Sequence, residues 1–127
     1  MQTLGATLTL VEPGVVEIEL PYRSELTQQH GFLHAGVIAS VLDSACGYAA
    51  FSLMPADAEV LSVEFKINLL APARGDRLLA RAEVKRAGRT ATVCTADAYT
   101  LEGAQRKAVA TMLGTMMSVR GRSDIAR

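Results

Sequence analysis

Apolar and polar residues alternate along most of the chain, which is the pattern of strands that bury one face. The alternation predicts a hairpin with arms over residues 5–10 and 15–20 and a turn at Pro13-Gly14. One segment differs, because from Ala35 to about Leu53 the apolar residues recur at the spacing of a helical face. Four more strands are predicted after it, over residues 61–69, 78–85, 90–100 and 106–119. We therefore expect one helix followed by a long antiparallel meander, with a hairpin before it.

The predicted helix consists mainly of small side chains, and Asp43 is its only formally charged residue. Such a helix is expected to be buried nearly all round, with a sheet of about six strands wrapped around it. The fold class is therefore α+β, with one domain over residues 1–120 and a polar, frayed tail over 121–127. A wide sheet with a single helix leaves sheet surface and edges exposed, which favours association.

Composition and charge exclude several classes of protein. Thirteen basic residues balance thirteen acidic ones, so the chain has no general attraction for nucleic acid or an anionic membrane. Cys46 and Cys94 are too few for a disulfide scaffold. The uncharged stretches over 26–42 and 44–56 are too polar or too short to span a bilayer, and the first residues lack the features of a signal peptide. These observations predict a cytoplasmic protein with no nucleic-acid or membrane partner.

The first candidate for chemistry is the predicted helix start, His34-Ala35-Gly36. A helix start offers N–H groups without partners and the positive end of the helix dipole, and Ala35 and Gly36 let a substrate carbonyl approach closely. That is the geometry of an oxyanion hole, but a tight turn into a helix has the same sequence. His30 and His34 are four residues apart, but the intervening glycine and the missing carboxylate motif predict no metal site.

Asp43 is the second candidate, because a carboxylate in an apolar helix is costly unless it is paired. It is either a structural group that accepts hydrogen bonds from nearby N–H groups or a catalytic base or nucleophile. Cys46 is a weaker candidate nucleophile, since cysteines on such helices usually pack in the core. Ala35 and Asp43 are eight residues apart, about 12 Å along a helix. If both serve one site, the helix start must come from a second subunit.

Two motifs together resemble the hotdog-fold thioesterases of the phenylacetate-pathway type. The first is Gln28-x5-His34-Ala35-Gly36-x6-Asp43, and the second is the segment LSVEFKINLLAPARGD over residues 61–76. The resemblance covers most of the chain, up to Val119. It implies a hotdog fold, a twofold dimer with a continuous sheet and often a tetramer of two dimers. It also implies hydrolysis of acyl-coenzyme A thioesters, a reaction that needs no cofactor.

The resemblance also implies roles for individual residues. Asp43 would activate water or attack the carbonyl, and the N–H of Ala35 would polarise the thioester oxygen. His34 would hold the turn or contact the thioester. Gln28 stands where the family commonly has Asn, and the neighbouring Gln29 is an alternative for that role. A strand serine that places the water or the carboxylate corresponds to Ser62, although strict alternation puts Ser62 opposite the core-facing residues.

Substrate contacts are less defined by the sequence. Gly36 is expected to lie beside the carbonyl, and Phe32 is expected to shape the pocket together with Tyr48 and Phe51. Arg89 is one of several scattered basic residues that meet the phosphates of the ligand or serve only solubility. The alternative function is a hotdog module that binds an acyl thioester without turnover. A dehydratase on this fold is not expected, because neither histidine stands in the required motif with an acidic partner.

Overall fold

The computed structural model describes residues 1–120, so the predicted tail over 121–127 lies outside the described residues. The helix α1 (Ala35–Phe51) and the strands closely match the predicted ranges. The strands are β1 (Thr7–Glu12), β2 (Val15–Pro21), β3 (Glu59–Leu69), β4 (Arg77–Ala87), β5 (Ala91–Glu102) and β6 (Gln105–Val119), and a short 3-10 helix η1 (Ser24–Leu26) precedes α1. None of the helices in the described part of the chain is long and apolar enough to span a membrane.

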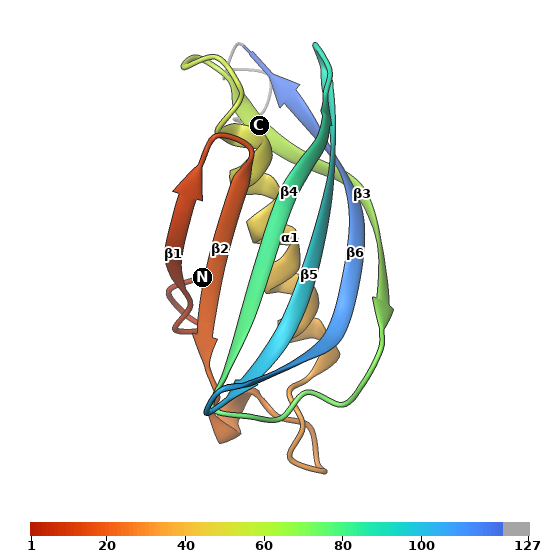
Figure 1. Cartoon of the computed structure of the whole chain (residues 1–127). Coiled ribbons are helices and arrows are strands. Elements are labelled where there is room, and N and C mark those ends of the chain that lie inside the picture. The colour runs from red at the N-terminus through yellow and green to blue at the C-terminus, as the bar shows by residue number, and fades with distance from the viewer. Residues whose placement is uncertain (121–127) are drawn as a thin grey trace.

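The six strands form one antiparallel sheet in the order β1-β2-β4-β5-β6-β3 (Figure 1). The predicted four-strand meander is therefore wrong, because β3 pairs with β6 at the edge and β2 lies beside β4. The cause is the connection over residues 70–76, which is longer than the usual hairpin loop and crosses from one side of the sheet to the other. This crossing leaves β3 as an edge strand.

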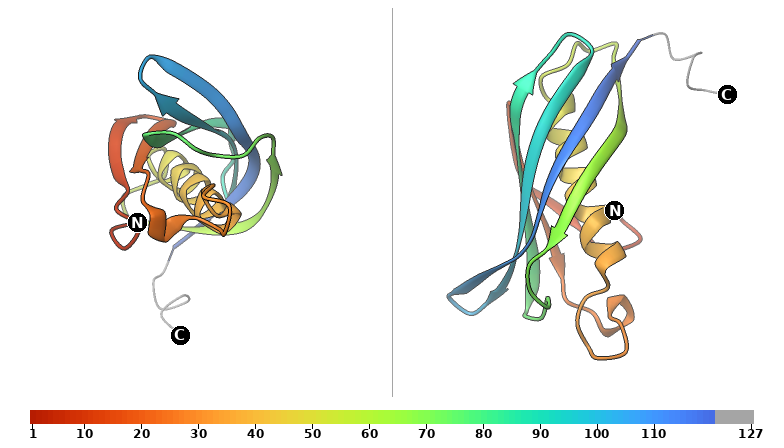
Figure 2. Two further views of the ribbon diagram at one scale, coloured as in Figure 1. Left: turned by 90° about the horizontal axis from the view of Figure 1, so that it is seen from below. Right: turned by 90° about the vertical axis from the view of Figure 1, so that its right-hand side faces the viewer.

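The sheet curves around α1, with β1 and β2 on one side and β3 on the other (Figure 2). This arrangement confirms the predicted hotdog fold. One face of α1 is buried against the sheet through Ile38, Val41, Leu42, Ala45, Cys46, Ala49 and Ala50. The opposite face is exposed at Gly36, Ser40, Tyr48 and Phe51. The expectation that the helix is buried nearly all round is therefore wrong for one protomer, because the curved sheet covers only one side of it.

A β-bulge in β3 reverses which residues face the helix. Ser62 lies opposite Met116 and Glu64 lies opposite Thr115, so Val63 is the extra residue. Met116 is fully buried, which places Ser62 on the helix side of the sheet. The expectation from strict alternation, that Ser62 lies away from the core, is therefore wrong. A bulge adds one residue to one strand, and the alternation on its two sides is then out of phase.

As an edge strand, β3 is unusually apolar. Its exposed large side chains are Leu61, Val63, Phe65 and Leu69. Its outer neighbours Leu113 and Met117 on β6 are also at least 40% exposed. Proteins normally protect a long edge strand with charges, proline or a covering segment. The side of the sheet that ends in β3 therefore has the composition of an interface.

Candidate active site

Backbone hydrogen bonds fix the approach to α1 and the position of its first residues. The N–H of Leu33 donates to the Ala73 carbonyl at 2.9 Å, and the N–H of His34 donates to the Leu26 carbonyl at 2.9 Å. His34 is the N-cap, and its Nδ1 accepts a hydrogen bond from the Gly36 N–H at 3.0 Å. Among residues 1–120, the N–H of Ala35 donates to no acceptor. Of the two N–H groups at the helix start, that of Ala35 is therefore the one open to a ligand.

The loop before the helix places Gln28 in the same hollow as Ala35. The side-chain oxygen of Gln28 accepts from the N–H of His30, and its backbone carbonyl accepts from the Gly31 N–H at 3.0 Å. Gly31 has a φ of +84°, which favours glycine at this turn. Gln28 lines the hollow at the helix start, whereas Gln29 is exposed beside His30. Of the two glutamines that the sequence proposes, Gln28 is the one placed near Ala35.

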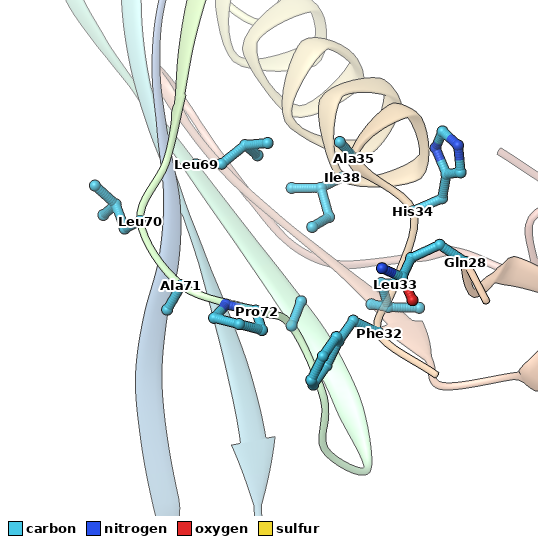
Figure 3. Close-up of a pocket in the computed structure, with 11 residues that line it drawn as sticks. Gln28, Phe32, Leu33, His34, Ala35, Ile38, Leu69, Leu70, Ala71 and Pro72 are labelled. Atoms are coloured by element: carbon cyan, nitrogen blue, oxygen red, sulfur yellow. The ribbon is translucent and has the colours of Figure 1, made fainter. Parts of the chain in front are cut away.

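The helix start opens onto an apolar hollow of about 570 Å³. Its walls come from the approach to α1, the first turns of the helix and the connection that follows β3. Figure 3 shows Ile38 and Leu69 pointing toward each other across it, while the His34 ring points away. Phe32 lines the same hollow, whereas Tyr48 and Phe51, which the sequence analysis groups with it, line a different one.

Asp43 lies farther along α1 and is held by β3. The hydroxyl of Ser62 donates to Oδ1 of Asp43 at 2.7 Å and also lies 3.4 Å from the sulfur of Met116. In the described part of the chain, this carboxylate accepts no hydrogen bond from a backbone N–H group. A purely structural Asp43 that serves nearby N–H groups is therefore not what the structure contains. The carboxylate is half-buried, and within residues 1–120 its hydrogen bond is the one that Oδ1 accepts from the Ser62 hydroxyl.

Cys46 is poorly placed to be the nucleophile. It is fully buried in the core against Cys94, whose thiol lies 3.6 Å from the Cys46 carbonyl oxygen. The hydrogen bond with Cys94 and burial raise the pKa of Cys46 well above its ordinary value. The thiolate, which is the reactive form, is therefore strongly disfavoured.

Asp43 borders a second hollow, of about 330 Å³, between the later turns of α1 and the start of β3. The residues that line it are Asp43, Ser44, Gly47, Tyr48, Phe51, Glu59, Val60 and Ser62. Ala35 is not among them, since it lies about 12 Å back along the helix axis. One protomer therefore holds the two halves of the predicted site in separate hollows.

Arg89 lies in a third hollow, of about 390 Å³, with Thr90, Ser118 and Arg120. The β5–β6 pairing brings these residues together, and the Ser118 N–H donates to the Thr90 carbonyl at 2.8 Å. Two guanidinium groups and two hydroxyls in one hollow suit an anionic group. Sequence reasoning missed Arg120, because it is close to Arg89 only through strand pairing.

Comparison with known proteins identifies relatives along most of the chain. A model of the thioesterase superfamily matches residues 30–107. A thioesterase family protein from Silicibacter pomeroyi is 57% identical, with a TM-score of 0.94 over 95% of this chain and 89% of that one. The PaaI protein of the E. coli phenylacetic acid degradation operon is 24% identical, with a TM-score of 0.84 over 94% of this chain and 83% of that one.

Among curated proteins, one from Halobacterium salinarum, whose name assigns it provisionally to the esterases, is 35% identical over 95 residues. The match covers 71% of this chain and 62% of that protein. The chain thus spans about three fifths of the length of this relative.

Proposed function

Because the chain belongs to the thioesterase superfamily, we propose that it hydrolyses acyl-coenzyme A thioesters to the free acid and coenzyme A without a cofactor. The observation that carries the proposal is the Asp43 carboxylate, oriented by Ser62 on a helix whose first N–H group has no partner in the described chain. The finer assignment to the phenylacetate-pathway type rests on the motif from Gln28 to Asp43. The likeness to PaaI itself, at 24% identity, supports the fold alone.

The proposed chemistry divides between the two halves of the site. Asp43 takes a proton from water as the hydroxide adds to the carbonyl carbon, or its carboxylate adds directly and water later cleaves the anhydride. In both routes the N–H of Ala35 donates to the oxyanion. Collapse of the intermediate breaks the C–S bond, and the coenzyme A thiolate leaves and takes up a proton. His34 caps the helix and so holds the Ala35 N–H in place.

A thiol-release assay with a panel of acyl-coenzyme A substrates tests this function. Release of free thiol that rises with enzyme concentration supports hydrolysis. Tight binding without thiol release supports the alternative, a module that binds acyl thioesters without turnover.

Arg89 and Arg120 are proposed to contact phosphate groups of the coenzyme, because both line one hollow with two hydroxyl groups.

Assembly is part of the proposal, because one protomer separates Asp43 from Ala35. A twofold axis beside β3 would join two sheets and set two α1 helices antiparallel, so that each Asp43 faces the Ala35 of the partner. The exposed apolar side chains of β3 support this dimer. Leu61, Leu113 and Met117 form an apolar patch on the outer face of the sheet, away from α1. In the dimer the two copies of this patch would lie on the same outer face, one on each side of the twofold axis. An apolar surface of this kind supports the association of two dimers into a homotetramer.

We expect light scattering in dilute solution to give the mass of a dimer or a tetramer. The variant Val63→Lys places a charge on the β3 edge, and it should shift the protein toward the monomer and remove activity at the same time. Val11→Lys is the matched control, since Val11 is a similarly exposed valine on the opposite edge strand β1. An active monomer in either the wild type or Val63→Lys would contradict a site shared by two subunits.

Loss of the Ser62 hydroxyl is expected to lower kcat about tenfold with little change in KM. A hydrogen bond to a charged group contributes about 1.5–3 kcal/mol, and about 1.4 kcal/mol corresponds to one decade in rate. The measurement is steady-state kinetics of Ser62→Ala on the best thioester. Thr115→Val is the control, because its hydroxyl donates to Glu64 at 2.7 Å on the outer face of the same strand pair. Unchanged kcat in Ser62→Ala would remove Ser62 from the site.

A further inference from the structure

Gly47 lies in the interior of α1, one helical turn after Asp43 and on the same face. Glycine is disfavoured in a helix interior, because it has no side chain to pack and loses the most backbone freedom. Apart from its chain neighbours and the adjacent backbone of α1, a Cβ atom added at Gly47 would meet no atom of residues 1–120 within 4 Å. By contrast, a Cβ at Gly88 would lie 2.4 Å from the Ala91 carbonyl oxygen. Packing within the protomer therefore gives no reason for glycine at position 47.

The space in front of Gly47 is the hollow that Asp43 borders. Tyr48, Phe51 and Val60 give it apolar walls. The carboxylate of Asp43 also lines it, and among residues 1–120 no lysine or arginine does. Such a lining favours an uncharged apolar group, because a bound carboxylate would be repelled by the negative charge of Asp43. Aromatic walls add favourable contacts with a flat or branched group.

We propose that this hollow binds the acyl group, and that Gly47 provides the room for an uncharged acyl group that is branched or cyclic next to the carbonyl. The inference rests on the proposed thioesterase function and names its substrate class. Because Gly47 is one turn from Asp43, it lies where the first carbons beyond the reacting carbonyl pass the helix. A methyl group at this position narrows the site at that point, while the reacting groups stay in place.

The test compares benzoyl-, isobutyryl-, acetyl- and succinyl-coenzyme A as substrates of the wild type and of Gly47→Ala. The wild type is expected to prefer benzoyl or isobutyryl over acetyl and to act poorly on succinyl. For each protein, kcat/KM for benzoyl-coenzyme A is divided by kcat/KM for acetyl-coenzyme A. This ratio is expected to be about tenfold or more lower in Gly47→Ala than in the wild type, because one methyl group in a pocket changes discrimination by about that factor. The melting temperature of Gly47→Ala should not fall, since alanine is the better helix residue.

Val11→Ile is the matched control, because it adds one methyl group at an exposed position of the edge strand β1, on the opposite side of the sheet from β3 and outside both hollows of the helix. Its substrate ratio should equal that of the wild type. An unchanged ratio in Gly47→Ala, an equal loss for all acyl groups, or a preference of the wild type for succinyl would overturn the inference. So would a loss of oligomeric mass in Gly47→Ala, because Gly47 would then serve contact between subunits.

The proposed function fails separately, if the wild type releases thiol from none of the substrates. The same variants are then compared by calorimetry for binding of S-benzyl- and S-methyl-coenzyme A, which are not hydrolysed. A lower benzyl-to-methyl affinity ratio in Gly47→Ala supports the inference about the hollow. An equal ratio in the two proteins overturns it.

Discussion

Replacing Asp43 by asparagine is expected to lower kcat by a factor of about 10²–10⁴ and to leave the fold intact. A general base contributes a factor of that size, and an amide can neither accept the proton of water nor attack a carbonyl. Asparagine keeps the volume of the side chain, and its amide oxygen can still accept the Ser62 hydrogen bond. The measurements are thiol-release kinetics and circular dichroism.

Asp97→Asn is the control for this experiment, since Asp97 is an exposed carboxylate on β5, in the outer hollow that Arg81 and Arg106 also line. Its kcat should equal that of the wild type. If a folded Asp43→Asn protein turns over like the wild type, the carboxylate has a structural role and the proposed chemistry is wrong.

Replacing Ala35 by proline is expected to lower kcat about 10²–10³-fold, because proline removes the one N–H group proposed to bind the oxyanion. The helix should tolerate the change. Proline is favoured at the first position of a helix, and the preceding His34 has φ −64° and ψ 137°, a conformation compatible with a following proline. Ala35→Gly keeps the N–H group and is the control, with activity close to that of the wild type. A fully active, folded Ala35→Pro protein would place the oxyanion elsewhere.

A mixture of these two variants, each expected to be nearly inactive, tests whether one site is shared by two subunits. If each site takes Asp43 from one subunit and Ala35 from its partner, a mixed dimer of Asp43→Asn and Ala35→Pro protomers has one intact site. Equal amounts that are unfolded and refolded together should recover about a quarter of the wild-type activity by random pairing. Recovery of none, with mixed dimers demonstrated by mass spectrometry, would place both groups of a site in one protomer.

The helix start and Asp43 are predictable from the sequence because their signals are local. Asp43 is recognisable because it is the only charged residue in a segment with a helical pattern of apolar residues. The start of the helix is recognisable because the small residues Ala35 and Gly36 precede that pattern. Ser62 is different, because the bulge at Val63 decides which face it occupies and alternation along β3 does not show it. The position of β3 beside β6 is also invisible in the local pattern, since it depends on a crossing connection and on long-range strand pairing.

The dependence of β3 on β6 sets the order in which the site can be completed during protein synthesis. Ser62 is held in the sheet through its pairing with Met116, and these two residues are 54 positions apart in the chain. The ribosome therefore releases Asp43 and its hydroxyl partner well before the strand that fixes them in place. Until then, the apolar edge of β3 has no strand of its own chain to pair with, and the nascent protein is exposed to misassociation at the surface that we propose to join its subunits.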